Sequence, residues 1–227
     1  MLSLRGRNYA IALLFASFFS AATELRAANI TLQGAFASDD VVQLFDVVLN
    51  SAASVDLRTY GYAGGTASNG QAVPRGGFDP ILTLFDGSGV FIVENDDGIG
   101  VANDALTQQP LDARILTTLG AGHYILALTQ YDNFVTALNL ADGFDEAGHG
   151  NFTADSSFTD GPPCASGQFR DTSDVPGACR NGNWTVDFQN VTSATARSAA
   201  VVPEPSTYAL LLLGSLTLLR RRAASKR

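Results

Sequence analysis

The stretch that decides the fold runs from Phe78 to Val93 and has the sequence FDPILTLFDGSGVFIV. Two apolar runs, residues 81–85 and 90–93, flank the segment Asp86-Gly87-Ser88-Gly89. A Gly-rich turn between two short apolar runs is typical of a β-hairpin, because glycine reaches the backbone conformations that a tight turn needs. The stretch therefore predicts antiparallel β-structure near the middle of the chain.

Further short strands are expected on both sides of this hairpin, separated by turns rich in Gly, Asp and Asn. Helical periodicity is weak, and its only candidate, residues 103–119, is interrupted by Pro110. The expected strands cover residues 41–49, 55–60, 81–85, 90–93, 124–129 and 184–188. This pattern favours an all-β fold, with a single β-sandwich or jelly-roll-like domain over residues 29–192.

The composition and charge of the chain exclude some classes of function. The chain has 227 residues, of which 46% are hydrophobic and 16% charged, so it is not an acidic disordered chain. Its net charge is -8, but the segment before Asn29 carries +2 and the segment from Pro203 carries +4, which leaves -14 on the middle. Such an acidic domain argues against nucleic acid as a partner.

The first 28 residues have the pattern of a secretory signal peptide. Arg5 and Arg7 form a positive start, and the apolar stretch 9–19 has the length of a signal core. Small residues follow and allow cleavage near Asn29. The sequence thus predicts an N-terminal signal helix over residues 1–28; the alternative is an uncleaved N-terminal anchor.

The other end carries three signals in order. A small polar linker is expected over residues 193–202, and the segment 203–227 begins with Pro203, Glu204 and Pro205. A short apolar transmembrane helix is expected over residues 206–219, although a comfortable span needs about 20 residues. The cluster that follows should stay cytoplasmic by the positive-inside rule; its members are Arg220, Arg221 and Arg222.

Pro-Glu-Pro, one short apolar helix and a terminal Arg cluster together resemble the PEP-CTERM sorting domain. The resemblance implies processing by an exosortase, an integral-membrane cysteine protease-transpeptidase, in a Gram-negative bacterium. It also implies an inner-membrane-anchored precursor, followed by export to the cell envelope or to an extracellular matrix. The alternative is a simple tail anchor with an accidental Pro-Glu-Pro.

A second resemblance covers residues 34–131. The segment Asp79 to Asp86 looks like the Asp-x-x-Leu-x-Leu-aromatic-Asp hairpin of bacterial pre-peptidase C-terminal (PPC-type) domains. Other blocks fall in matching order, namely Asp40 to Phe45, Gly89, Asn95 to Asp97, and Leu119 to Tyr124. The region 141–180 departs from the simple pattern. The resemblance implies an accessory β-sandwich and not a catalytic domain.

Motifs of enzymatic chemistry are not found in the sequence. His123 and His149 lie far apart, no His-Glu-x-x-His zinc pattern occurs, and Gly87-Ser88-Gly89 is better explained as a turn than as a nucleophile elbow. We therefore expect a non-enzymatic protein. A hydrolase with a dispersed site is kept as a third hypothesis, because geometry rather than sequence order defines such sites.

Cys164 and Cys179 are the only two cysteines. Behind a signal peptide, an even pair in a Gly/Pro-rich region is typical of a disulfide, because exported proteins meet an oxidising environment. We therefore predict one disulfide between them.

Aspartates gather around the central hairpin. Asp79 and Asp86 bracket one predicted strand, and Asp96 and Asp97 follow the next one. Oxygen ligands on loops suit Ca²⁺, although Val93 stands where an EF-hand loop needs its first Asp. Asp79, Asp86, Asp96 and Asp97 are thus candidate calcium ligands. The alternative is that these residues only form turns, which Asp does well.

Three functions follow as hypotheses. The first is a non-enzymatic structural or adhesive component of the envelope or matrix, sorted through its PEP-CTERM tail. The second is a surface module that binds calcium or carbohydrate, such as extracellular polysaccharide, with exposed aromatic side chains stacking on the sugar. The candidate aromatics are Tyr60, Tyr62 and Phe78, in or beside the Gly-rich loop 61–77. The third is the dispersed-site hydrolase.

Overall fold

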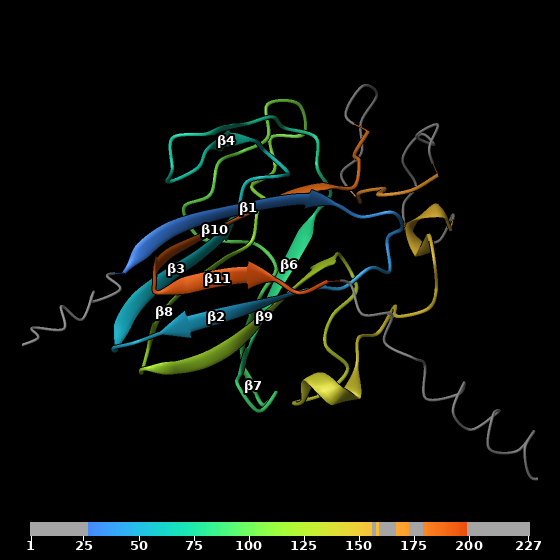
Figure 1. Cartoon of the computed structure of the whole chain (residues 1–227). Helices are drawn as coiled ribbons and strands as arrows, with labels where there is room; N and C mark the ends of the chain where they lie inside the picture. The colour runs from blue at the N-terminus through green and yellow to red at the C-terminus, as the bar shows by residue number, and fades with distance from the viewer. Residues whose placement is uncertain (1–26, 156–157, 159–166, 173–178, 199–227) are drawn as a thin grey trace, which may run out of the picture.

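The computed structural model describes residues 27–155, 158, 167–172 and 179–198. In this part of the chain the only helical segments are two three-residue 3₁₀ turns, η1 (Leu140–Asp142) and η2 (Phe152–Ala154). All other regular structure consists of β-strands (Figure 1). The predicted all-β fold is confirmed.

The strands form two large antiparallel sheets and one small hairpin (Figure 1). The four-stranded sheet contains, in spatial order, β1 (Ala28–Ala35), β10 (Asn183–Val191), β3 (Ala53–Thr59) and β8 (Arg114–Leu119). The five-stranded sheet contains β11 (Ser193–Ala196), β2 (Gln43–Leu49), β9 (Gly122–Gln130), β6 (Pro80–Asp86) and β7 (Phe91–Asn95). The small hairpin pairs β4 (Gly65–Thr66) with β5 (Ala72–Val73).

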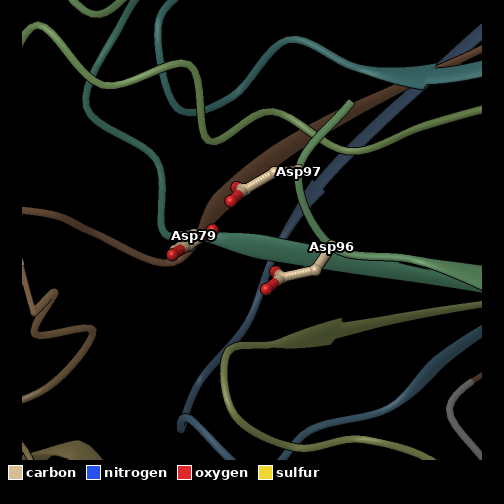
Figure 2. Close-up of side chains that lie close together, drawn as sticks. All are labelled: Asp79, Asp96 and Asp97. Atoms are coloured by element: carbon tan, nitrogen blue, oxygen red, sulfur yellow. The ribbon is translucent and has the colours of Figure 1, made fainter. Parts of the chain in front are cut away.

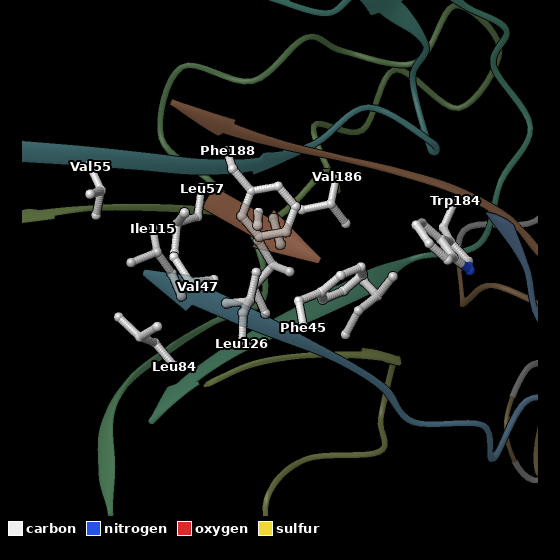
Figure 3. Close-up of a cluster of buried hydrophobic side chains, with 14 of the residues drawn as sticks. Phe45, Val47, Val55, Leu57, Leu84, Ile115, Leu126, Trp184, Val186 and Phe188 are labelled. Atoms are coloured by element: carbon white, nitrogen blue, oxygen red, sulfur yellow. The ribbon is translucent and has the colours of Figure 1, made fainter. Parts of the chain in front are cut away.

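The two sheets pack face to face over one apolar core (Figure 3). Alternate residues along each strand point to the same side, so Leu57 and Phe188 of one sheet meet Phe45, Leu84 and Leu126 of the other. All five side chains are completely buried. Because each such side chain contributes about 1.5–3 kcal/mol on burial, this interior is the main source of stability.

A smaller apolar cluster covers the outer face of the five-stranded sheet. Phe85 and Ile125 pack there with Phe144, which comes from the long segment after β9. Strand β6 is therefore buried on both faces, apart from its last residue. This explains why its sequence is an almost continuous apolar run rather than an alternating one.

The structure contains a strand within each of the six predicted segments, and the turn after β6 closes as expected with Gly89 N–H donating to Asp86 C=O (3.0 Å). One expectation was wrong. The predicted linker begins with a strand, β11, which hydrogen-bonds along β2 from the Ser193–Val48 pair onward. The helix candidate ends in strand β8, because Pro110 precedes it and Ile115 fits the core beside β3.

Several predicted features lie outside the described residues: residues 1–26 of the signal peptide, Cys164, and the tail from Pro203 through the helix 206–219 to Arg222. The disulfide between Cys164 and Cys179 accordingly stays a prediction. Across the described ranges, no helix is long and apolar enough to cross a membrane.

Candidate metal centre

The start of β6 lies beside the turn that follows β7, because the two strands are antiparallel neighbours and Leu82 pairs with Asn95. Asp79 immediately precedes β6, and Asp96 and Asp97 immediately follow β7. Figure 2 shows the three carboxylates gathered at this point. One carboxylate oxygen from each residue lies within 4.8 Å of the others. We call these three residues the acidic cluster.

The fourth predicted ligand, Asp86, does not belong to the cluster. It stands at the opposite end of β6, where its carboxylate accepts hydrogen bonds from the Ser88 hydroxyl (2.7 Å), Ser88 N–H (2.8 Å) and Val90 N–H (3.0 Å). These bonds, that of the Ser88 hydroxyl first, lower the pKa of Asp86. Asp86 is a turn residue, so its assignment as a ligand beside Asp79 is wrong.

Burial makes the acidic cluster electrostatically unusual. Only 5% of Asp79 is exposed, and one oxygen of its carboxylate accepts no hydrogen bond; the same is true of one oxygen of Asp96. Burial raises the pKa of Asp79 well above its ordinary value, and the charges of Asp96 and Asp171 raise it further. Burial, and then Asp97, raise the pKa of Asp96 to about 7. Burial and Asp171 also raise the pKa of Asp97.

No basic side chain of the described residues forms an ion pair with the acidic cluster. Arg114 lies close to the cluster but does not pair with it. Its backbone N–H donates to the side chain of Asn95, the residue directly before Asp96 (2.8 Å). Its guanidinium nevertheless turns to Asp56, at 2.6 Å and 2.8 Å. Within this part of the chain, no positively charged side chain therefore offsets the negative charges of the cluster.

Backbone contacts hold the cluster in place. The Asn95 side chain also donates to the Asp97 carbonyl (3.2 Å), and Gly98 N–H donates to the Asp112 carbonyl (2.9 Å). A side chain at Gly98 would come within 2.5 Å of the Arg114 side chain, so only glycine lets the turn approach β8 this closely. The Asp79 carbonyl accepts from Tyr131 N–H (2.8 Å). The carboxylates are thus positioned by a fixed backbone.

A second group of buried aspartates, which sequence reasoning missed, surrounds Tyr62. Arg75 Nε lies 2.6 Å from Asp104, and Arg180 lies 3.5 Å from Asp104 and 3.8 Å from Asp171. The Tyr62 hydroxyl donates to Asp171, and the Arg180 guanidinium stacks 3.5 Å from the centre of the Tyr62 ring. Burial acts to raise the pKa of Asp104, but hydrogen bonds, that from Arg75 first, outweigh it and lower the pKa. We call this set the arginine-paired group.

The predicted aromatic platform for sugars is wrong. Tyr62 is fully buried in the arginine-paired group, and Phe78 is buried against Phe36, with ring centres 4.8 Å apart. Tyr60 is half-buried and lies under the Arg58 guanidinium. A groove of about 550 Å³ does lie beside the β4–β5 hairpin. Its polar side chains include Gln33, Gln71, Asn181 and Asn183, and its apolar wall includes Trp184.

The two histidines lie apart from the acidic cluster. His123 stands beside Gly87, at the opposite end of β6, and His149 contacts Glu146 with Nδ1 at 2.9 Å. The structure therefore does not bring a histidine and the three aspartates together. What the acidic cluster offers chemically is a set of hard oxygen atoms for a cation.

Comparison with known families finds one match, in which residues 201–223 correspond to the PEP-CTERM protein-sorting motif. This motif implies an exported protein that an exosortase sorts and processes. No curated protein and no solved structure matches the chain. No family match supports the PPC-like character of the β-domain, so that resemblance stays a prediction.

Proposed function

We propose that the β-domain is a non-enzymatic, PPC-like module of the cell envelope or extracellular matrix, delivered there by its signal peptide and by exosortase processing. The observation that carries the proposal is the order of parts. A β-sandwich with a continuous core ends with β11 at Ala196, and the sorting motif begins at residue 201. The described fold therefore reaches to within a few residues of the sorting motif.

The composition of the tail supports a processed precursor rather than a permanent anchor. The apolar run 206–219 is shorter than the roughly 20 residues of a comfortable span, and Arg220 to Arg222 would hold its end in the cytoplasm. Pro203 and Pro205 lack N–H donors, so the segment around Glu204 joins neither a sheet nor a helix easily. An extended segment of this kind at the membrane surface is accessible to a protease.

The test is fractionation of cells that express the native gene with and without the exosortase. We expect the wild type to release a form without the tail, as measured by mass spectrometry. Glu204→Ala, or loss of the exosortase, should leave the full-length protein in the inner membrane. Asp142→Asn, a surface change in the β-domain, serves as the control and should be released normally. Release with an intact tail, or release without exosortase, would contradict the proposal.

A second candidate function is carbohydrate binding in the groove beside the β4–β5 hairpin. Its amides offer donors and acceptors for sugar hydroxyl groups; Gln71, for example, donates to Gln33 (2.8 Å) at its rim. A glycan array tests this directly. Binding that Gln71→Ala or Asn183→Ala weakens would favour it, and an array without any bound glycan would speak against it.

Activity assays on the purified protein test the non-enzymatic part of the proposal. Any hydrolytic activity that persists through purification and is lost in His123→Ala would support the dispersed-site hydrolase instead. The side chain of His123 is exposed on β9, so this substitution should leave the fold intact. Absence of turnover on polysaccharide, ester and peptide substrates is the expected result.

A further inference from the structure

We propose that the acidic cluster of Asp79, Asp96 and Asp97 is a calcium site that ties the start of β6 to the turn between β7 and β8. The inference concerns the β-domain itself and goes beyond its sorting. Sorting is measured by fractionation and calcium by binding, so either idea can fail alone.

The unpartnered oxygen of Asp79 is the observation that points to a ligand. A carboxylate that is 95% buried loses its hydration, and a buried oxygen without a donor is costly. Asp104, at a similar depth, meets this cost with hydrogen bonds from Arg75, Leu106 and Thr107. Asp79 has no such side-chain partner among the described residues, and its carboxylate lies among other carboxylates. A bound cation would satisfy all three groups at once.

The spacing suits calcium. Ca²⁺ binds oxygens at about 2.3–2.6 Å, so two of its ligands lie at most about 4.6–5.2 Å apart. The three carboxylate oxygens already fall within 4.8 Å of one another. Mg²⁺ binds at about 2.0–2.1 Å and demands near-ideal octahedral geometry, which makes it the less tolerant of the two ions. The cluster can thus accept Ca²⁺ with little movement of its backbone.

Solvent exposure increases from Asp79 to Asp97, which gives the ion a route into the site. Asp79 is buried, Asp96 is half-buried and Asp97 is exposed, so the ion would enter from the Asp97 side and lie against Asp79. Three carboxylates supply three to six of the six to eight oxygens that Ca²⁺ takes, and water can supply the others at the open side. When all three are ionised, as ion binding requires, their combined charge of about -3 favours a divalent over a monovalent cation.

The contrasting explanation is that the carboxylates share protons and no metal binds. Titration calorimetry on the purified full chain separates the two at pH 7.5, with CaCl₂, MgCl₂ or EDTA. We expect one Ca²⁺ per chain, weaker Mg²⁺ binding, and a melting temperature that rises with Ca²⁺. At a Ca²⁺ concentration ten times Kd, the folding equilibrium constant should increase about 11-fold.

Asp79→Asn provides the sharpest variant, because it removes the buried charge at nearly constant shape. We expect it to weaken Ca²⁺ binding more than about 10-fold while leaving the EDTA-treated protein at least as stable as the wild type. Asp86→Asn is the matched control: it is the same change at the other end of β6, and it should leave Ca²⁺ binding unaltered.

Asp97→Asn covers the case in which Asp79→Asn does not fold, because the Asp97 side chain is exposed and its loss should not disturb the core. It too should weaken Ca²⁺ binding. No binding heat in the wild type, with identical melting curves in Ca²⁺ and EDTA, would overturn the proposal. Equal Ca²⁺ binding in the wild type, Asp79→Asn and Asp97→Asn would overturn it as well.

Discussion

The two groups of buried aspartates differ most in whether basic side chains lie beside them. In the arginine-paired group, Arg75 and Arg180 surround Asp104, and its pKa lies below the ordinary value. In the acidic cluster, Asp79 faces other carboxylates, and its pKa lies well above that value. The residue type and the depth are similar, so the difference comes from the neighbours. The first group has positive side chains within the protein, whereas no basic side chain of the described residues pairs with the second.

The largest effect should come from removing a cation of the arginine-paired group. Arg180→Met leaves Arg75 as the one cation beside Asp104 among the described residues and removes the Arg180–Asp171 ion pair, and breaking a buried pair costs about 3–5 kcal/mol. Urea denaturation should show this loss in the free energy of unfolding. The double variant Arg180→Met with Asp104→Asn should recover part of it, since the stranded charge is then gone. A single-variant loss below about 1 kcal/mol would mean that the pairing is not structural.

The comparison becomes sharper when one substitution is made in each group. Asp104→Asn should destabilise the protein by about 1.5–3 kcal/mol, because charged hydrogen bonds from Arg75 are lost. In EDTA, Asp79→Asn should have the opposite sign or no effect, because it removes repulsion. Thermal melting of the two variants side by side measures the difference. Equal destabilisation by both would show that Asp79 has structural partners of its own.

The acidic cluster should also give the metal-free protein an inverted pH dependence. The pKa of Asp96 is about 7 in the fold and about 3.9 in an unfolded chain, so the fold binds protons more tightly. Its contribution to stability is therefore present below about pH 4 and is lost as the pH rises toward 7. Melting temperatures in EDTA should show this fall between about pH 4 and pH 7. Asp96→Asn should flatten the curve, and Ca²⁺ should restore stability at the upper end.

The smallest effect belongs to an ion pair at the surface. Arg197 lies 2.6 Å from Asp46 and lowers its pKa, first through their hydrogen bond, but both side chains are at least one-third exposed. Water and salt screen such a pair, so Arg197→Ala should cost less than about 1 kcal/mol, and less again in 0.5 M NaCl. Urea denaturation at the two salt concentrations is the measurement. A loss above 2 kcal/mol would show that this end of β11 contributes more than its charge.

How far the sequence predicts this fold depends on where a strand lies in its sheet. Inner strands such as β9 and β10 bury much of their length, and their apolar residues made them recognisable. Of the four strands at the edges of the two large sheets, three were not predicted, namely β1, β8 and β11. β1 has no buried residue, β11 has one and β8 has two, so the apolar signal in each of their sequences is weak. The fourth edge strand, β7, was predicted because the turn Asp86-Gly87-Ser88-Gly89 before it is a clear hairpin signal.

For the candidate site too, what the sequence predicts depends on strand arrangement. Asp96 and Asp97 could be placed beside Asp79 because a hairpin brings the start of one strand to the end of the next. The same argument excludes Asp86, which lies at the turn itself, and a closer use of strand direction would have removed it. The arginine-paired group had no signal of this kind, because Arg75, Asp104 and Arg180 meet only through the packing of three separate loops.

The pairing of the first strand has a consequence for the order of events during export. Strand β1 pairs with β10, and Thr31 donates to Asp187, 156 positions later in the chain. Contacts over such distances form slowly, and β1 has no other strand to pair with while the chain is still emerging. The N-terminal strand must therefore remain unpaired until residues 183–191 are available. In an export that starts from the N-terminus, the four-stranded sheet can therefore be completed only after β10 has followed β1 across the membrane.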